Sequence, residues 1–326
     1  MKLISEMINK FKQAFSAMQN AKNILLVTHN KPDGDALSSI CAFIELFSVM
    51  EKKFTAYCYD EPYPQFGFLP HLEKIVSNRE KINFSEFDCI ISLDCGAPSR
   101  TMLKEELINR NKNQIAIEFD HHPKIEDYAD IEIRIPESSS TAEIIYKFLT
   151  VNKIRFNKNF ANCILTGILT DTGNFLYPST TNETIEIASK MLVYGARFPV
   201  ITENTYKNKT LSGMKIWGKA INNLKINKKY NFAYSVLTLN DLSESGATVD
   251  ELEGISGLLS NLHGVNALML LREEFPGKIK GSLRTANNNI DVSKLAIRLG
   301  GGGHPRASGF AFDGHIEETN NGWRII

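Results

Sequence analysis

The order of apolar and polar positions predicts alternating strands and helices in the first part of the chain. Short apolar runs rich in β-branched residues are typical of strands buried on both faces of a sheet. Such runs occupy 23–28, 53–59, 87–94 and 114–120, and 130–135 is a fifth candidate. Helical periodicity covers 1–20 and 36–50, and another helix is expected from about Ser99. This alternation predicts an α/β fold with a doubly wound parallel sheet.

The pattern changes to helices after Ser138. Ser140 and Glu143 have the spacing of a capping box, which predicts a helix start. Helices are also expected over 160–172, 184–194, 204–227 and 291–299, and strands over 231–238, 266–274, 278–284 and 309–312. We therefore expect a doubly wound domain over 1–195, a helical connector over 196–227 with the boundary near Thr210, and a smaller α/β domain over 228–326.

Length and charge limit the class of protein. A chain of 326 residues favours two domains, and its 37 basic and 37 acidic side chains cancel. A neutral chain is not typical of proteins that coat long nucleic acids, although it can hold a short anion locally. Five cysteines without a Cys-x-x-Cys pair are typical of reduced core thiols. With no signal-peptide pattern and no bilayer-length apolar run, a cytoplasmic location without membrane contact is expected.

Acids and imidazoles stand where the predicted strands end, and in open α/β sheets these ends form the ligand-binding edge. Each could act alone as a turn residue, a helix cap or a core histidine. Together, however, buried carboxylates repel unless cations neutralise them, so the set predicts a metal site. Its members are His29, Asp33, Asp35, Asp94, Asp120, His121 and His122, with Asp171 at a helix end.

The number and type of these ligands indicate the metal and the chemistry. They exceed what one ion needs, so two ions about 3.5–4 Å apart with a bridging carboxylate are expected. Oxygen and imidazole ligands without thiolate suit Mn²⁺, Mg²⁺, Fe²⁺ or Co²⁺ better than Ca²⁺ or structural zinc. Phosphate ester hydrolysis is the chemistry that such a pair of ions performs.

A glycine run followed by a histidine is the second feature of interest. Gly300–Gly303 and His304 lie between a predicted helix and strand, and glycine allows backbone N–H groups to approach an anion closely. Arg284 can bind a phosphate through its two-pronged guanidinium. A flexible turn and a surface salt bridge are the structural alternatives for these two features.

These motifs together resemble those of the DHH phosphoesterases. The matching residues are His29-x-x-x-Asp33-x-Asp35, Asp94, Asp120-His121-His122 and Gly167-x-x-x-Asp171-Thr172. Gly301-Gly-Gly-His304 resembles the signature of the DHH-associated C-terminal domain. The resemblance covers nearly the whole chain, and the length is similar to the nanoRNase/pAp phosphatase branch. It implies an enzyme that degrades very short oligoribonucleotides to mononucleotides and removes the 3′-phosphate of pAp.

The resemblance also implies a role for each motif residue. His29 and Asp33 would hold one Mn²⁺, and Asp35, His121 and Asp171 the other, with Asp94 bridging and with Mg²⁺ or Co²⁺ as substitutes. Asp120 would orient a histidine ligand, and His122 would face the scissile phosphate. The substrate would be bound by Arg284, Gly301, Gly302, Gly303 and His304.

Several other functions remain open at this point. The same two domains would suit a phosphodiesterase for cyclic di-AMP or linear pApA. A RecJ-like exonuclease on longer strands fits the neutral charge poorly, and a non-enzymatic nucleotide sensor is disfavoured because every predicted ligand is present. Family II pyrophosphatases share the first domain, but the glycine-histidine motif points elsewhere. The sequence does not rank pAp against dinucleotides, and it leaves the polarity of cleavage and a homodimer open.

Overall fold

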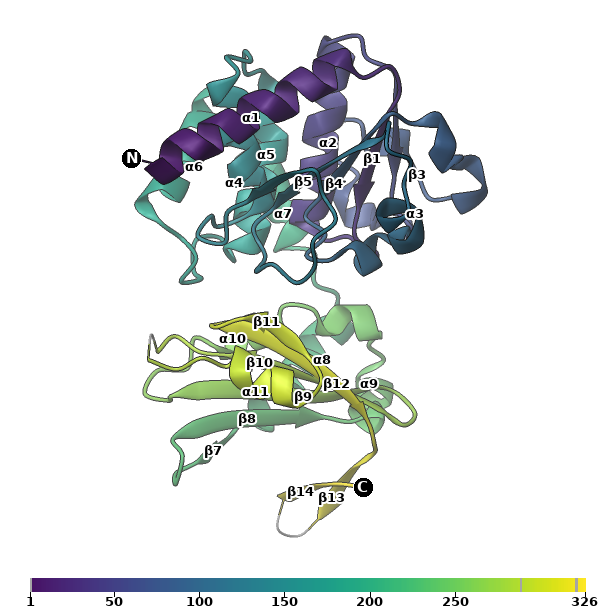
Figure 1. Cartoon of the computed structure of the whole chain (residues 1–326). Helices are drawn as coiled ribbons and strands as arrows, with labels where there is room; N and C mark the ends of the chain where they lie inside the picture. Colours follow the sequence, from purple (N-terminus) through teal and green to yellow (C-terminus); the bar gives the residue numbers. More distant parts are fainter. Residues whose placement is uncertain (1, 288, 320–321) are drawn as a thin grey trace. The chain divides into compact units, whose positions relative to one another are not determined.

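The computed structural model describes residues 2–287, 289–319 and 322–326, and the chain divides into two compact units, 1–208 and 209–326. Figure 1 shows the elements of both units. Met1, the first residue of the expected N-terminal helix, lies outside the described residues, and helix α1 spans Lys2–Asn20. Each unit has its own sheet and its own buried core.

The first unit contains a six-stranded sheet whose strand pairs are all parallel, which confirms the predicted doubly wound sheet. The strand order is β3-β2-β1-β4-β5-β6, so the order reverses between β1 and β4. The strands are β1 Ile24–Thr28, β2 Phe54–Tyr57, β3 Ile75–Val76, β4 Cys89–Leu93, β5 Ile115–Asp120 and β6 Ile131–Arg134.

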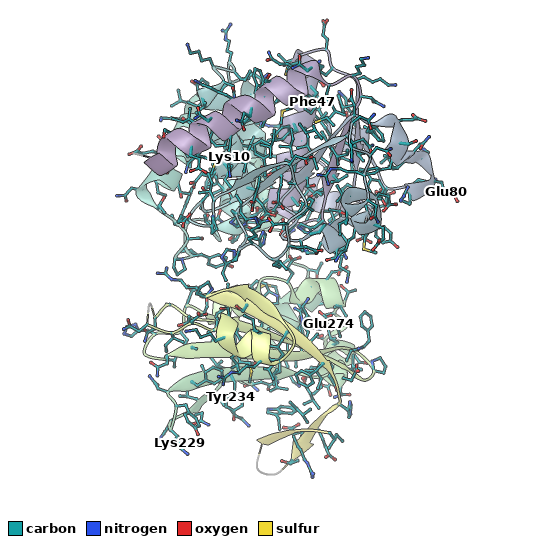
Figure 2. The ribbon with its side chains drawn as sticks, in the orientation of Figure 1. Lys10, Phe47, Glu80, Lys229, Tyr234 and Glu274 are labelled. Carbon is teal, nitrogen blue, oxygen red and sulfur yellow. The ribbon has the colours of Figure 1, made fainter. Side chains whose placement is uncertain are left out.

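Helices cover both faces of this sheet unequally. The larger core lies between one face of the sheet and helices α1, α2, α4 and α5. Phe47 of α2 is fully buried in this core (Figure 2). Glu80, by contrast, is exposed. The other face packs on Leu107 of the short helix α3 and on Leu103, which directly precedes it. The remaining helices of the unit are α2 Gly34–Val49, α3 Lys104–Ile108, α4 Thr141–Val151, α5 Lys158–Asp171, α6 Asn182–Val193 and α7 Phe198–Thr205.

One local prediction in this unit is wrong, whereas the predicted helix start at Ser140 is confirmed. The helix expected from Ser99 is a 3-10 turn, Pro98–Thr101, which ends at Met102 in a left-handed conformation (φ 59°), and α3 begins only at Lys104. Ser140 does cap α4 by accepting from the Glu143 N–H, but the Glu143 carboxylate bonds to Ser139 and not to Ser140. The cap therefore forms without the full reciprocal box.

The second unit has a mixed sheet in the order β11-β12-β10-β9-β8-β7, in which only β8 and β9 run parallel among the described strands. Its strands are β7 Lys225–Asn227, β8 Phe232–Leu237, β9 Ala267–Phe275, β10 Lys278–Arg284, β11 Gly302–His304 and β12 Ala307–Asp313, followed by the hairpin β13 Ile316–Thr319 and β14 Gly322–Ile325. Its helices are α8 Leu211–Asn222, α9 Leu239–Ser245, α10 Ile255–Leu259 and α11 Ser293–Arg298.

The segment 196–227, expected as a helical connector, is divided between the two units. Helix α7 ends at Thr205 in the first unit, and α8 begins at Leu211 in the second. Ile216 and Ala220 of α8 are buried in the core of the second unit, and the last residues of the segment form strand β7. Residues 206–210, between the two helices, are therefore the part that links the units.

Two predictions from composition can be compared with the structure. All five cysteines are buried free thiols, as expected for core cysteines. In the described part of the chain, none of the helices combines the length and apolar character needed to span a membrane.

Candidate metal centre

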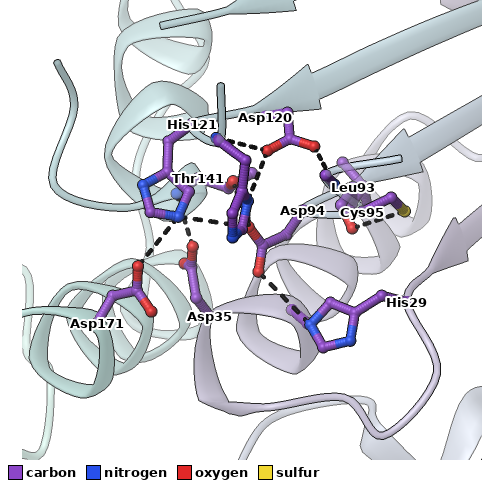
Figure 3. A network of polar contacts seen from close by, with 12 residues as sticks. His29, Asp35, Leu93, Asp94, Cys95, Asp120, His121, Thr141 and Asp171 are labelled. Atoms are coloured by element: carbon purple, nitrogen blue, oxygen red, sulfur yellow. Dashed lines mark hydrogen bonds and ion pairs between the residues drawn. The ribbon is translucent and has the colours of Figure 1, made fainter. Parts of the chain in front are cut away.

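The predicted site lies where the strand order of the first sheet reverses. His29 follows β1, Asp94 follows the neighbouring strand β4, and Asp120 is the last residue of β5. In an open parallel sheet the carboxyl ends of the two strands at such a reversal leave room for a ligand. Figure 3 shows that the polar side chains from these ends converge with Asp35 of α2, Thr141 of α4 and Asp171 of α5.

The start of helix α2 places two of the acids. Asp33 is the N-cap of α2, and its carboxylate accepts the N–H groups of Asp35 and Ala36 at 3.1 Å. An acid at this position is favoured because the first N–H groups of a helix have no partner within the helix. The cap holds Asp33 at the edge of the site and turns Asp35 into the buried interior.

Asp35 is fixed by the start of a second helix, α4. Its two carboxylate oxygens accept the backbone N–H groups of Thr141 at 2.6 Å and Ala142 at 3.0 Å. Helix α5 approaches closely at Gly167, where a Cβ atom would lie 2.4 Å from the nearer Asp35 oxygen. Gly167 is therefore needed for the packing of α5 against the site.

Three sets of ligand atoms lie close enough together to hold a metal ion. They are His29, Asp33 and Asp94; Asp35, His121 and Asp171; and Asp94, His121 and His122. Asp94 belongs to two of these sets and lies next to the third, because its Oδ2 is 3.9 Å from His29 Nε2 while its Oδ1 is 3.7 Å from His121 Nε2. Its Oδ1 also accepts the Thr141 hydroxyl at 2.9 Å. A carboxylate that faces both sides in this way has the geometry of a bridging ligand.

Burial and mutual repulsion destabilise the ionised form of the central acids. Burial raises the pKa of Asp35 well above its ordinary value, and the Asp171 charge raises it further. Burial likewise raises the pKa of Asp94, with added repulsion from Asp35 and Asp33. These carboxylates are thus poorly stable as anions without a cation, and a divalent cation would remove the repulsion.

The histidines direct one ring nitrogen toward the acids. His29 Nδ1 lies 2.7 Å from the carbonyl oxygen of Asn30, which places the proton on Nδ1 and the lone pair on Nε2. His121 Nε2 lies 3.1 Å from Asp171, and its Nδ1 faces the Ser138 carbonyl. Backbone carbonyls behind metal-binding imidazoles commonly set the tautomer in this way.

Asp120 holds His122 in place. One Asp120 oxygen accepts the His122 backbone N–H and lies 2.8 Å from Nδ1, and the other accepts the Gly96 N–H at 2.5 Å. Behind it, Arg134 donates to the His122 carbonyl at 2.6 Å and pairs with Glu118 at 2.6 Å. Asp120 thus contacts the imidazole of His122 and belongs to none of the three ligand sets.

The two units match two known domains. Residues 23–168 match the DHH family, N-terminal domain, and residues 229–321 match the DHHA1 domain. The chain belongs to the DHH family. With this pair of domains it is a hydrolase of phosphate esters, and the acid-histidine cluster agrees with the dependence of DHH phosphoesterases on metal ions.

Similar proteins cover almost the whole length of this DHH protein. The enzymes named bifunctional oligoribonuclease and PAP phosphatase NrnA are 26% identical in Thermus thermophilus and 27% identical in Bacillus subtilis. They match 89% and 88% of this chain, and 84% and 88% of their own lengths. A solved exopolyphosphatase-related protein from Bacteroides fragilis is 27% identical with a TM-score of 0.82, covering 93% of this chain and 90% of its own.

In the DHHA1 unit, the residues singled out in the sequence lie on adjacent strands. Arg284 of β10 is paired with Ala307 of β12, which is paired in turn with His304 of β11. Residues opposite one another across antiparallel strands point to the same face. Arg284 and His304 therefore share a face of the sheet, with the small side chain of Ala307 between them.

The glycine run has a packing role that its sequence did not reveal. Gly302 and Gly303 are strand residues of β11 and not part of a flexible turn. A Cβ atom at Gly301 would lie 2.1 Å from the Gly309 carbonyl, and Gly303 has a φ of 135°. At Gly302, by contrast, no described atom would lie within 4 Å of a Cβ atom. Close strand packing thus explains Gly301 and Gly303 but does not explain Gly302.

Sequence reasoning missed Thr141 and Arg134. Thr141 contacts both Asp35 and Asp94, and Arg134 supports the DHH segment from strand β6. The first could have been found as the residue after the Ser140 cap, since N–H groups at a helix start bind anions. The second carries little local signal, because apart from Glu132 on its own strand its partners come from β5 and the loop that follows it.

Proposed function

We propose that this chain hydrolyses very short oligoribonucleotides to mononucleotides and also removes the 3′-phosphate of pAp. The observation that carries the proposal is the pair of ligand sets joined by Asp94, in a chain similar over most of its length to enzymes named for these two activities. The buried free thiols agree with work in the reducing cytoplasm.

Two Mn²⁺ ions are the proposed cofactor, with Mg²⁺ or Co²⁺ as substitutes. His29 and Asp33 would hold one ion, Asp35, His121 and Asp171 the other, and Asp94 would bridge them. Carboxylate oxygens and imidazole nitrogens are the ligands such ions accept, and the raised pKa values of Asp35 and Asp94 support a cation at this position. When bound, the ions would polarise the phosphoryl oxygen and make a water molecule more acidic.

The chain's own residues would position the substrate and move protons. Asp120 keeps the His122 ring at the edge of the cluster, where Nδ1 lies 3.5 Å from Asp94. We assign His122 to the scissile phosphate, where an imidazole can donate a hydrogen bond to a phosphoryl oxygen. Thr141 would keep Asp94 aligned through its hydroxyl. Arg284, Gly301, Gly302, Gly303 and His304 would bind a phosphate or terminal nucleotide of the substrate.

A substrate panel tests this proposal. Purified chain with Mn²⁺ is given pAp, RNA dimers to pentamers, cyclic di-AMP and pyrophosphate, and the products are separated by chromatography. We expect mononucleotides from the short RNAs and inorganic phosphate from pAp. Preference for cyclic di-AMP would favour the cyclic dinucleotide alternative, and absence of any hydrolysis would contradict the proposal.

A further inference from the structure

An arginine outside the motifs lies beside the proposed catalytic histidine. Arg100 belongs to the 3-10 turn Pro98–Thr101, which follows β4 and Asp94. Its backbone is fixed at both sides, because its N–H donates to the Ala97 carbonyl and its carbonyl accepts the Asn30 N–H at 2.7 Å. Asn30 directly follows His29, so the turn that carries Arg100 is attached to the ligand loop of β1.

The guanidinium points toward the site. An ideal Cβ position on Gly96 would lie 3.5 Å from Arg100 Nη1 and 3.6 Å from His122 Cγ, so both side chains border the same small volume. Gly96 has a φ of 69°, and its missing side chain leaves this volume open. Arg100 and His122 therefore flank one point next to the metal centre.

The Arg100 guanidinium has no direct polar partner in the described part of the chain, although its charge favours the ionised form of Asp33. Among residues 2–287, 289–319 and 322–326, no hydrogen bond or ion pair involves the Arg100 side chain. Three other arginines of the first unit are paired, Arg79 with Glu106, Arg110 with Asp130 and Arg134 with Glu118. Arg100 is partly exposed, so its donors are open to a group that enters from the solvent.

The positive charge of Arg100 also exceeds the balance of charges at the centre once two divalent cations are bound. The four carboxylates of Asp33, Asp35, Asp94 and Asp171 balance two divalent cations. Arg100 then adds a positive charge beyond this balance. A phosphate anion is the group that would match it, since a guanidinium presents parallel donors to two phosphate oxygens.

We propose that Arg100 binds a non-bridging oxygen of the substrate phosphate at the metal centre, opposite His122. This contact is separate from those proposed for Arg284 and His304, because it comes from the catalytic unit itself. It rests on the proposed function, in that the anion is the phosphate of a short oligonucleotide or of pAp. It makes Arg100 a determinant for anionic substrates at this centre.

Three variants test the role of Arg100. Arg100→Ala removes the donors, Arg100→Lys keeps the charge with a single ammonium group, and Lys112→Ala is the control. Lys112 is exposed and precedes β5, at the opposite end of the strand from Asp120. Lys112→Ala therefore removes one positive charge, as Arg100→Ala does, but at a position away from the site. For each protein we would measure kcat and KM on a dinucleotide, inhibition by inorganic phosphate, the Mn²⁺ concentration for half activation, and Tm.

We expect Arg100→Ala to lower kcat/KM by about 10- to 100-fold, the usual range for a lost hydrogen bond to a charged group, with Arg100→Lys in between. Inhibition by phosphate should weaken in parallel, whereas the Mn²⁺ requirement and Tm stay those of the parent. An unchanged kcat/KM, or a defect that excess Mn²⁺ restores, would overturn the proposal. If the parent itself fails to cleave the dinucleotide, the proposed function fails instead.

Discussion

At the scale of single residues, the position of Asp94 places the strictest requirements on backbone conformation and on side-chain orientation. It is buried, it adopts a left-handed conformation with a φ of 59°, and its two oxygens face different histidines. Asparagine and aspartate tolerate this conformation better than other side chains with a Cβ atom. Asp94→Asn is therefore the variant that removes the charge while keeping the shape and the backbone.

We predict opposite effects of Asp94→Asn on activity and on metal-free stability. Activity should fall about 100-fold or more, because a charged group aimed at the reacting centre is lost. Without metal, Tm should rise by about 2–4 °C per kcal/mol of relieved repulsion, whereas the Mn²⁺-dependent rise in Tm should shrink. Calorimetry with and without Mn²⁺ measures both. Asp127→Asn, at an exposed position, is the control, and equal behaviour of the two variants would contradict the role of Asp94.

Glu45 provides a separate prediction about pH. It is buried and accepts hydrogen bonds from Asn157 at 2.6 Å and Asn159 at 2.9 Å, with His71 Nε2 at 2.5 Å. Burial opposes ionisation, but the hydrogen bonds from His71 and the two asparagines lower the pKa of Glu45 below the ordinary 4.5. The ionised group thus stabilises the fold above pH 4.5, and this contribution is lost as the pH falls through the lowered pKa.

Glu45→Gln should consequently lower Tm most at pH 7, and the difference from the parent should narrow toward pH 3. Glu80→Gln, on an exposed turn, should change Tm little at any pH. Thermal unfolding followed by circular dichroism at several pH values gives the comparison. A difference for Glu45→Gln that stays constant with pH would show that its charge is not the stabilising feature.

Whether a site residue could be predicted from the sequence depends on how far along the chain its contacts lie. His29, Asp94, Asp120 and Asp171 could be selected because each stands at the end of an apolar run, and Asp33 because it lies in the polar segment that follows the first run. Arg134 and Arg100 could not, because their importance depends on which strands and loops the fold brings together. That Asp120 contacts His122 also required the structure, since two adjacent histidines have equal claims on a neighbouring acid in sequence.

At the scale of elements, two glycines within helices allow the effect of close packing on stability to be separated from the effect of helix propensity. Replacing glycine by alanine inside an exposed helix usually stabilises it by about 0.5–1 kcal/mol. Gly218 of α8 fits this case, because no described atom lies within 4 Å of an added Cβ atom. At Gly167 of α5, however, the added atom would lie 2.4 Å from Asp35 and 2.5 Å from the Ala142 side chain.

Gly218→Ala should therefore raise Tm slightly and leave activity unchanged. Gly167→Ala should lower Tm and reduce activity by at least about tenfold, because a shift of the Asp35 ligand of around 1 Å misaligns the metal centre. Activity and Tm of the two variants, measured side by side, test this. Parent-like activity of Gly167→Ala would mean that α5 can retreat without disturbing Asp35.

Elements with long apolar patterns were predictable, whereas short ones were not. Strands β1, β4 and β5 are fully or almost fully buried, so their apolar runs revealed them. Strand β3 has only two residues, and the 3-10 turn at Pro98 looks like a helix start in sequence. Strand β11 was missed because glycines favour turns, although here they allow close packing on β12.

At the scale of the whole molecule, charge limits the length of the substrate. The chain has equal numbers of basic and acidic residues, 37 of each, and long single strands are usually held by extended basic grooves. Each nucleotide beyond those in contact adds negative charge and disorder without adding a contact. The catalytic efficiency should therefore fall as RNA grows longer than the few nucleotides that the proposed site contacts.

The most direct test of the account is a competition in one tube. A labelled RNA dimer and a labelled twenty-mer are mixed at equal concentration with the chain and Mn²⁺, and Asp94→Asn serves as the inactive control. We predict that the dimer is converted to mononucleotides first, at a clearly higher kcat/KM, and that the control cleaves neither RNA. Faster, processive degradation of the twenty-mer would contradict the account and indicate an exonuclease for long strands.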